Sequence, residues 1–358
     1  MTRFACLSLV LSLTACTESP GTTTGSGGAS GSPAGTGGTP QGGSGGSGGT
    51  AGTGGSVTGT GGTASGGSSG SGGTAGSDAG SVDAPPEVAT DAAGEAGPGG
   101  FSKQWSCPAG ALPAGTVGTQ TPVCVGFKFN FGYHEGPTWI ASQNAFFFSD
   151  FTERNGRTGD MIKFTPSTGM CEVFIKDAGC NGLAVHANGK IVGACHTSHS
   201  ITEFDPVTKA KRVIVDTYNG RNLGAPNDVV VHSNGTIYFT NTLYEAISTN
   251  PYPPAVFWID PTGKLNLLMD SGPNGIALSP DEKKLHVVGA GVWTLDDKGV
   301  PGARTGGGPG GDGISVDCAG GIHILGTNSA YGGPDGKTLF IVGRNGIFTA
   351  PSNIPGLP

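Results

Sequence analysis

Six segments in the C-terminal part of the chain share one pattern of apolar and polar residues. Each begins with a residue that bears a side-chain oxygen, usually followed by glycine. An alternating apolar strand, a polar turn and a second strand come next. The alternation predicts half-buried strands, and the Asn-Gly and Asp-Gly pairs in the turns accept the positive φ of tight hairpins. No segment has a convincing 3.6-residue apolar period, so we expect no long helix. The six segments begin at Glu135, Asn181, Asn227, Asn274, Asp312 and Tyr331.

The spacing of these segments predicts a ring of similar sheets. The first three intervals, from Glu135 to Asn274, are 46, 46 and 47 residues long, and a four-stranded propeller blade needs about 40–50 residues. We therefore expect an all-β fold, a six-bladed β-propeller. The next two intervals, ending at Asp312 and Tyr331, are only 38 and 19 residues. The last two blades are thus expected to be shortened or to share strands.

Equivalent positions of successive propeller blades form a ring around the central channel. The first residues of five segments, Glu135, Asn181, Asn227, Asn274 and Asp312, are therefore predicted to converge there. Turn formation is an alternative reason for Asn or Asp before Gly, and it would account for one or two of them. It does not account for Glu135, which is a poor turn residue and is followed by Gly-Pro. The pattern favours a convergent site.

The composition divides the chain of 358 residues into a leader, a linker and one folded domain. Residues 21–80 contain 27 glycines, and residues 17–100 contain no Phe, Trp, Tyr, Lys or Arg. Such a stretch cannot bury enough apolar surface to offset the entropy of ordering its backbone. We expect residues 17–100 to be a disordered linker and residues 101–358 to be the propeller. This domain holds 20 acidic and 18 basic residues, and it has no basic stripe that would suggest nucleic acid.

The N-terminus has the features of a bacterial lipoprotein leader. Arg3 precedes the apolar run 4–13, which is too short to span a bilayer as a mature helix. The run ends in Leu13-Thr14-Ala15-Cys16, which resembles a lipobox, so Cys16 is the predicted lipid anchor. An ordinary secretory peptide with a chance cysteine is the alternative. We expect a protein of the cell envelope, in the outer membrane or periplasm, that touches the membrane only through its lipid.

Six cysteines in an oxidising compartment favour disulfides. Cys107 with Cys124 is the first predicted pair, because it would staple the entry segment. Cys180 with Cys171 or Cys195 is the second. A zinc site is disfavoured, because the sequence contains no C-x₂-C spacing.

Several motifs together resemble those of the SMP-30/gluconolactonase/LRE-like family, in family order over most of residues 124–348. That family is a six-bladed propeller with a divalent metal, commonly calcium, in its channel. Its members hydrolyse aldonolactones, and relatives hydrolyse organophosphates. The motifs are His-Glu135-Gly-Pro-Thr-Trp, Pro-Asn227-Asp-Val-Val-Val, Pro-Asn274-Gly-Ile-Ala-Leu-Ser-Pro-Asp-Glu-Lys, Asp312-Gly-Ile-Ser-Val-Asp and Tyr331-Gly-Gly-Pro-Asp-Gly-Lys-Thr-Leu-Phe.

The resemblance implies four metal ligands, which are Glu135, Asn227, Asn274 and Asp312. It places Asp228 and Asn181 close by. Hard oxygen donors of this kind suit Ca²⁺, or another divalent cation, better than zinc. Asp312 is the predicted base that activates water, and Asp228 is the second candidate. Asn181 and His196 are candidate substrate-binding residues, although a loop role for His196 is the plainer interpretation.

The predicted function is therefore metal-dependent hydrolysis of a small lactone or ester by a monomer. The metal would polarise the carbonyl group, and a carboxylate would activate water. Two alternatives stay open: a non-catalytic propeller that binds a sugar or other ligand at the cell surface with a structural metal, and a strictosidine-synthase-like relative. A serine hydrolase is disfavoured, because no Gly-x-Ser-x-Gly elbow occurs.

Overall fold

The described part of the chain is built from antiparallel strands. The structure, a computed structural model, describes residues 106–152, 158–245 and 248–358, all within the unit Pro86–Pro358. The predicted leader (1–16) with Cys16 and the predicted linker (17–100) lie outside the described residues. The described residues form no α-helix and one 3₁₀ turn, η1 (Ala141–Gln143). No helix in this part is long and apolar enough to cross a membrane.

Five four-stranded sheets and two two-stranded sheets account for the strands. Four of the large sheets are formed by strands consecutive in sequence. These are β2–β5 (Tyr133–Ile140, Ala145–Phe151, Gly159–Thr165, Met170–Ile175), β6–β9 (Leu183–Val185, Ile191–Cys195, Ser200–Phe204, Lys211–Val215), β12–β15 (Ala225–Val231, Ile237–Thr242, Ala255–Ile259, Leu265–Met269) and β16–β19 (Ile276–Leu278, Lys284–Val287, Gly291–Leu295, Pro301–Thr305). The fifth has the order β1-β24-β23-β22 (Thr121–Pro122, Gly346–Pro351, Thr338–Gly343, Asn328–Gly332), and the small sheets are β10–β11 (Thr217–Tyr218, Arg221–Asn222) and β20–β21 (Ser315–Val316, Ile322–His323).

The predicted hairpin turns form at the Asn-Gly pairs. Gly189 and Gly235 have φ of +80° and +91°, the region that glycine adopts without strain. The preceding Asn188 accepts a hydrogen bond from the Lys190 N–H through its Oδ1 atom, at 3.0 Å. Each pair thus joins the first two strands of its sheet, β6 to β7 and β12 to β13.

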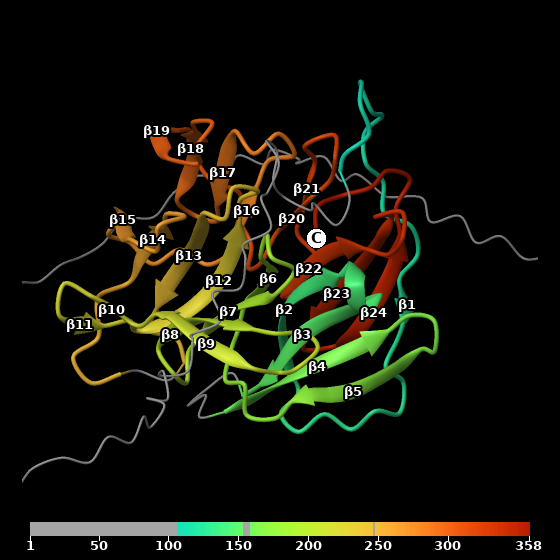
Figure 1. Ribbon diagram of the computed structural model, residues 1–358. Coiled ribbons are helices and arrows are strands. Elements are labelled where there is room, and N and C mark those ends of the chain that lie inside the picture. The colour runs from blue at the N-terminus through green and yellow to red at the C-terminus, as the bar shows by residue number, and fades with distance from the viewer. Residues whose placement is uncertain (1–105, 153–157, 246–247) are drawn as a thin grey trace, which may run out of the picture. The chain divides into compact units, whose positions relative to one another are not determined.

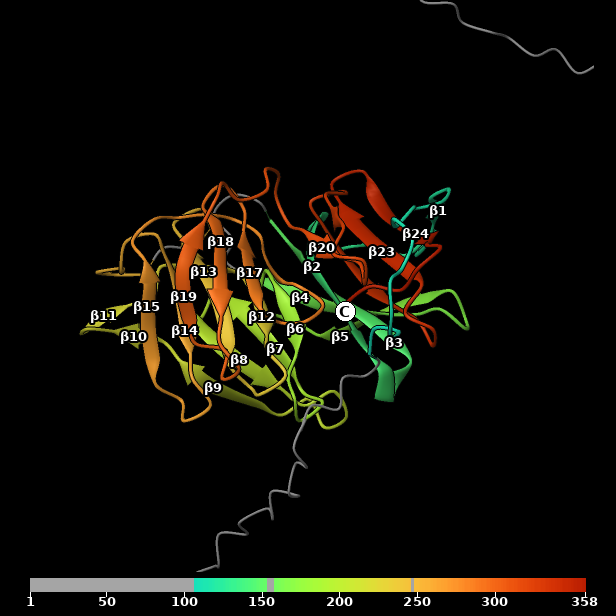
Figure 2. The ribbon, with the colours of Figure 1, turned by 90° about the horizontal axis from the view of Figure 1, so that it is seen from above.

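The first strands of the sheets form a closed ring. β2 contacts β6, and the contacts continue through β12, β16 and β20 to β22, which contacts β2 again. Figure 1 shows these strands near the middle of the described domain, while β5, β15 and β19 lie at its periphery. Figure 2 shows the same strands turned by 90° and seen from above. The arrangement is that of an all-β propeller.

The predicted number of six blades is not confirmed. Five sheets have four strands, and only the two-stranded β20–β21 lies between β16–β19 and the sheet of β22. The chain is too short there for a full blade, because β20 and β22 begin only 13 residues apart, at Ser315 and Asn328. The last sheet reaches four strands because β1, from the entry segment, pairs with β24.

Three disulfides fix the entry segment and the second sheet. All six cysteines of the domain are bonded, as predicted, in the pairs Cys107–Cys318, Cys124–Cys171 and Cys180–Cys195. The first predicted pair, Cys107 with Cys124, is wrong, because residues 117–123 run along the last sheet and hold the two cysteines apart. The second prediction is confirmed in the form Cys180–Cys195.

The hydrophobic core is divided among the spaces between neighbouring sheets. One cluster joins Phe147 of β3 to Ile191 of β7, and another joins Ile201 of β8 to Phe257 of β14. A third closes the ring, because Phe146 of β3 stacks on Phe340 of β23 with ring centroids 4.6 Å apart. Both faces of these sheets are therefore buried, and the axis is left for polar side chains.

Candidate active site

Five predicted site residues line one pocket of about 480 Å³. Each lies near the start of a different inner strand of the ring: Glu135 and Asn227 are the third residues of β2 and β12, and the other three precede β6, β16 and β20 by two or three residues. Glu135, Asn181 and Asn227 are buried, whereas Asn274 and Asp312 are partly exposed. The lining consists of Tyr133, Glu135, Asn181, Asn227, Leu243, Tyr244, Glu245, Asn274, Asp312 and Arg344.

Close approach of neighbouring strands explains why glycine follows most of these polar residues. A Cβ atom on Gly136 would lie 2.4 Å from the carbonyl oxygen of Asn181, and Gly136 has φ of +53°. A Cβ atom on Gly275 would lie 2.4 Å from the carbonyl oxygen of Asp312. A side chain at either position would push one sheet away from the next. These glycines therefore bring the oxygen-bearing residues of adjacent sheets together.

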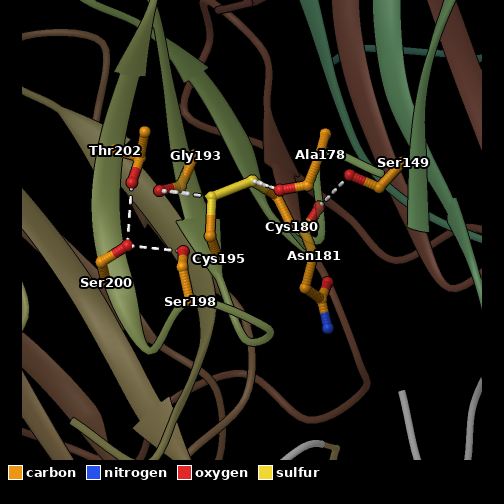
Figure 3. The surroundings of a disulfide bond; sticks show 9 residues. All are labelled: Ser149, Ala178, Cys180, Asn181, Gly193, Cys195, Ser198, Ser200 and Thr202. Atoms are coloured by element: carbon orange, nitrogen blue, oxygen red, sulfur yellow. Dashed lines mark hydrogen bonds between the residues drawn. A yellow bond between two sulfur atoms is a disulfide. The ribbon is translucent and has the colours of Figure 1, made fainter. Parts of the chain in front are cut away.

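A disulfide and two hydrogen bonds hold the main chain of Asn181. Cys180, its neighbour in sequence, is bonded to Cys195 of β7. The Asn181 carbonyl oxygen accepts a hydrogen bond from the Ser149 hydroxyl at 2.7 Å, and the Asn181 N–H donates to Ala194 at 2.9 Å. Figure 3 shows the amide side chain extending away from the disulfide. The amide itself donates to Glu245 Oε1 at 3.3 Å.

Asp228 lies beside the pocket and not in its lining. Its carboxylate accepts hydrogen bonds from the N–H groups of Val229, at 3.0 Å, and Ile276, at 3.1 Å. It lines a separate, mainly apolar cavity of about 90 Å³ formed by the inner strands. Burial raises the pKa of Asp228 to about 7, the nearby Asp312 adds to the rise, and hydrogen bonds including one from Asn328 oppose it. Asp228 therefore ties two sheets together and adds a carboxylate next to the pocket.

Several carboxyl groups lie close together in this pocket. Burial, and then the charges of Asp312 and Asp228, raise the pKa of Glu135 well above its usual value. Burial also raises the pKa of Glu245 to about 7, with Asp312 contributing. Among the described residues, Arg344 is the only cationic side chain in this lining, and its guanidinium carbon lies 5.0 Å from the centre of the Tyr133 ring. Repulsion between the acids indicates a site whose charge is incomplete without a cation.

The donor set fits a hard cation held by mixed ligands. Two predicted ligands are carboxylates and two are amides, and the Glu245 Oε2 atom is buried in the same pocket without a hydrogen-bond partner among the described residues. Oxygen donors of this kind suit Ca²⁺. No group of three or more His, Cys, Asp or Glu residues in the described ranges is arranged to hold a metal ion. A cation here would therefore depend on the amides of Asn227 and Asn274 as well as the acids.

His196 is not brought to this pocket. It is fully buried beside Phe151, with ring centroids 5.0 Å apart, and it does not belong to the pocket lining. Burial, with a smaller effect of His199, lowers the pKa of His196 to about 4, so the ring is neutral at pH 7. In the structure it packs in the turn between β7 and β8.

Four residues near the axis were not identified from the sequence. Tyr133, Glu245 and Arg344 line the pocket, and Asn328 bonds to Asp228. Asn328 opens β22 and is the sixth oxygen-bearing residue of the ring. The sequence pattern placed that repeat at Tyr331 because a Gly-Gly pair follows it, whereas Ser329 follows Asn328. Glu245 and Arg344 come from turns, for which the strand pattern gave no signal.

Residues 133–325 match the SMP-30/Gluconolactonase/LRE-like region, more than half of the chain. The chain belongs to the SMP-30/gluconolactonase/LRE-like family. A gluconolactonase of Zymomonas mobilis is 31% identical to this family member over 257 residues, which cover 60% of this chain and 70% of that protein.

Solved structures of related propellers support the fold of this family member. A gluconolactonase from Xanthomonas campestris has a TM-score of 0.54 and 22% identity, covering 69% of this chain and 99% of that one. A calcium-binding regucalcin from Agrobacterium tumefaciens has a TM-score of 0.50 and 18% identity, covering 70% and 97%. The matched region contains Glu135, Asn181, Asn227, Asn274 and Asp312, whereas Asn328 and Arg344 lie beyond it.

Proposed function

We propose that the protein hydrolyses a small lactone or ester in the pocket that contains Asp312. The observation that carries the proposal is the convergence of Glu135, Asn181, Asn227, Asn274 and Asp312 on one pocket. The gluconolactonase relative supports a lactonase-like activity. A pocket of about 480 Å³ is large enough for a small-molecule substrate.

The residues that would hold a divalent cation, with Ca²⁺ as the proposed ion, are Glu135, Asn227, Asn274 and Asp312. When bound, the cation would polarise the carbonyl group of the substrate and stabilise the charge that develops on its oxygen. The repulsion among the buried acids and the unpartnered Glu245 Oε2 atom support this proposal. So does the calcium binding of the regucalcin with the same fold.

Asp312 is the proposed general base. It lines the pocket and is partly exposed, so a water molecule can approach its carboxylate. Asp312 would take one proton from that water as the water oxygen attacks the carbonyl carbon. The bond between the carbonyl carbon and the ring or ester oxygen then breaks, and the leaving oxygen takes up a proton. The product is a hydroxy acid, or an acid and an alcohol.

Asp228 is the weaker candidate for the base. Its carboxylate is buried, and both of its oxygens accept main-chain hydrogen bonds across two sheets. A carboxylate held in this way is suited to positioning Asn227 and adding negative charge near the cation. The role proposed for Asp228 is therefore support of the site.

The leader extends the proposal to location and partners. A lipid on Cys16 would anchor the protein at the cell envelope, in the outer membrane or periplasm. The linker 17–100 would separate the anchor from a monomeric catalytic domain. The proposed partner is the small-molecule substrate, and the near balance of 20 acidic and 18 basic residues in 101–358 gives no support to nucleic-acid binding.

A lactone panel with and without metal tests the proposed function. The wild-type protein with CaCl₂ should hydrolyse at least one aldonolactone, measured by acid release at constant pH. EDTA should lower the rate by at least about a hundredfold, because the carbonyl group then loses its electrophilic partner. Adding back CaCl₂ is the control and should restore the rate.

Two outcomes would contradict the proposal. Hydrolysis that continues in EDTA would remove the metal from the mechanism. Calcium binding without turnover of any lactone or ester in the panel would favour the alternative of a ligand-binding propeller.

A further inference from the structure

The segment that follows β13 brings a carboxylate back over the pocket. Leu243, Tyr244 and Glu245 all belong to the pocket lining. The hydroxyl of Thr242, the last residue of β13, donates to the carbonyl of Ala225 at 3.0 Å, which ties the start of this segment to β12. The side chain of Glu245 is thereby placed between the second and third sheets of the ring.

Glu245 binds the amides of two sheets. Its Oε1 atom accepts a hydrogen bond from Nδ2 of Asn181, which precedes β6, at 3.3 Å. The side chain of Asn227, in β12, also interacts with the Glu245 carboxyl group and opposes the rise of its pKa. Both asparagines are buried, with exposed fractions of 3% and 4%. Few other partners are therefore available to orient these amides.

The chemistry of these bonds fixes which atom each amide turns toward the acid. An ionised carboxylate accepts hydrogen bonds and has no hydrogen to donate. Asn181 presents its NH₂ group to Glu245 in this way, and its carbonyl Oδ1 atom is left for another partner. An ionised Glu245 would hold Asn227 in the same orientation. Asn227 is a proposed cation ligand, and only its Oδ1 atom can serve as the donor to a hard cation.

We propose that Glu245 is a positioning residue that holds the amides of Asn181 and Asn227 by their NH₂ groups and so presents two carbonyl oxygens to the pocket. This inference rests on the cation site of the proposed function. It assigns to residues 243–245, which follow β13, a role in orienting the ligands of the cation. The Oδ1 atom of Asn181 is thereby available to bind the cation or to accept a hydrogen bond from a hydroxyl group of the substrate.

Calcium affinity without substrate tests this role. CaCl₂ is titrated into the metal-free wild-type protein, Glu245→Ala, Asn227→Ala and the double variant, and heat is measured. Partners that orient a metal ligand are worth about 10–100-fold in affinity, so Glu245→Ala should weaken binding by that factor. Because Glu245 acts partly through Asn227, the double variant should lose less than the product of the two single losses.

A second variant and a control separate the positioning role from a purely structural one. Glu245→Gln preserves volume but offers one carbonyl oxygen, so its loss should be smaller than that of the alanine variant. Glu172→Gln, at an exposed position in β5, is the control and should bind as the wild type does. The metal-free melting temperature of Glu245→Gln should not fall, whereas a purely structural role would lower it.

Three results would overturn the inference. They are unchanged calcium affinity in Glu245→Ala, wild-type affinity in Glu245→Gln, and single losses that multiply fully in the double variant. The last would make Glu245 an independent ligand. Failure of the proposed function would give a different result. If the losses of calcium affinity are non-additive but the protein hydrolyses no lactone, the positioning role of Glu245 is supported and the hydrolase activity is not.

Discussion

Asp312→Asn should lower kcat/KM for the best lactone by about a thousandfold, within the range that general-base catalysis contributes. The amide keeps a neutral oxygen of the same size in the pocket, so a cation retains a donor there. It cannot take the proton of the attacking water. The measurement is initial rate against lactone concentration at saturating CaCl₂, with calcium affinity measured in parallel.

The parallel measurement separates the two roles assigned to Asp312. If it acts as a base, the rate falls far more than calcium occupancy at saturating CaCl₂. If it serves only as a ligand, saturating calcium restores most of the rate. Asp297→Asn, at an exposed carboxylate of the β18–β19 turn, is the matched control and should keep wild-type kinetics. Full activity in Asp312→Asn with metal bound would show that another group takes the proton.

Glu135→Gln should weaken calcium binding by at least about a hundredfold and raise the stability of the metal-free protein. Glu135 is a buried carboxylate near two other acids, so removing its charge relieves repulsion when no cation is present. The same charge is a main attraction for Ca²⁺, so affinity falls. The measurements are calcium titration and melting temperature, each with and without CaCl₂.

The pH dependence of this variant follows from the direction of the Glu135 pKa shift. A carboxyl group whose folded pKa is raised favours the folded state below its unfolded value, and this contribution is lost as pH rises through the folded pKa. Metal-free wild-type protein should therefore lose stability with rising pH above about 4.5, the ordinary value for Glu. Glu135→Gln should lose less, so its gain in melting temperature should grow with pH. A gain that is the same at pH 5 and pH 8 would mean that Glu135 is not the buried, repelled carboxyl group of the structure.

The ring could be predicted from the sequence because its determinants are local. Alternation within each strand and the regular intervals from Glu135 to Asn274 identified the repeat without knowledge of tertiary contacts. The number of blades could not be predicted in the same way. The short stretch from Asp312 to Tyr331 is shared between two sheets, and β1 completes the last sheet. Both features depend on pairing between distant parts of the chain.

The site was predictable where it coincided with the repeat. Equivalent positions near the starts of the inner strands are occupied by Glu135, Asn181, Asn227, Asn274 and Asp312. The period of the repeat was therefore enough to predict that these residues lie close together. Residues from turns were not predictable, because no period governs a turn. Glu245 and Arg344 reach the pocket from such turns, and their acid and base character is common on any protein surface.

The first of the two disulfide predictions failed for a related reason. Cys107 with Cys124 was predicted because that pair would close the entry segment on itself, but the extended entry segment separates its own cysteines and brings each to a different distant partner. Cys180 and Cys195 are close in sequence and flank one strand pair, so the local argument held for them.

A crystal structure of the protein grown with CaCl₂ is the most direct test of the claim that one cation joins the starts of four inner strands. We expect a single ion with oxygens of Glu135, Asn227, Asn274 and Asp312 at about 2.3–2.6 Å, the usual range for calcium. Density for calcium elsewhere, with these four side chains apart and without a shared ion, would contradict it.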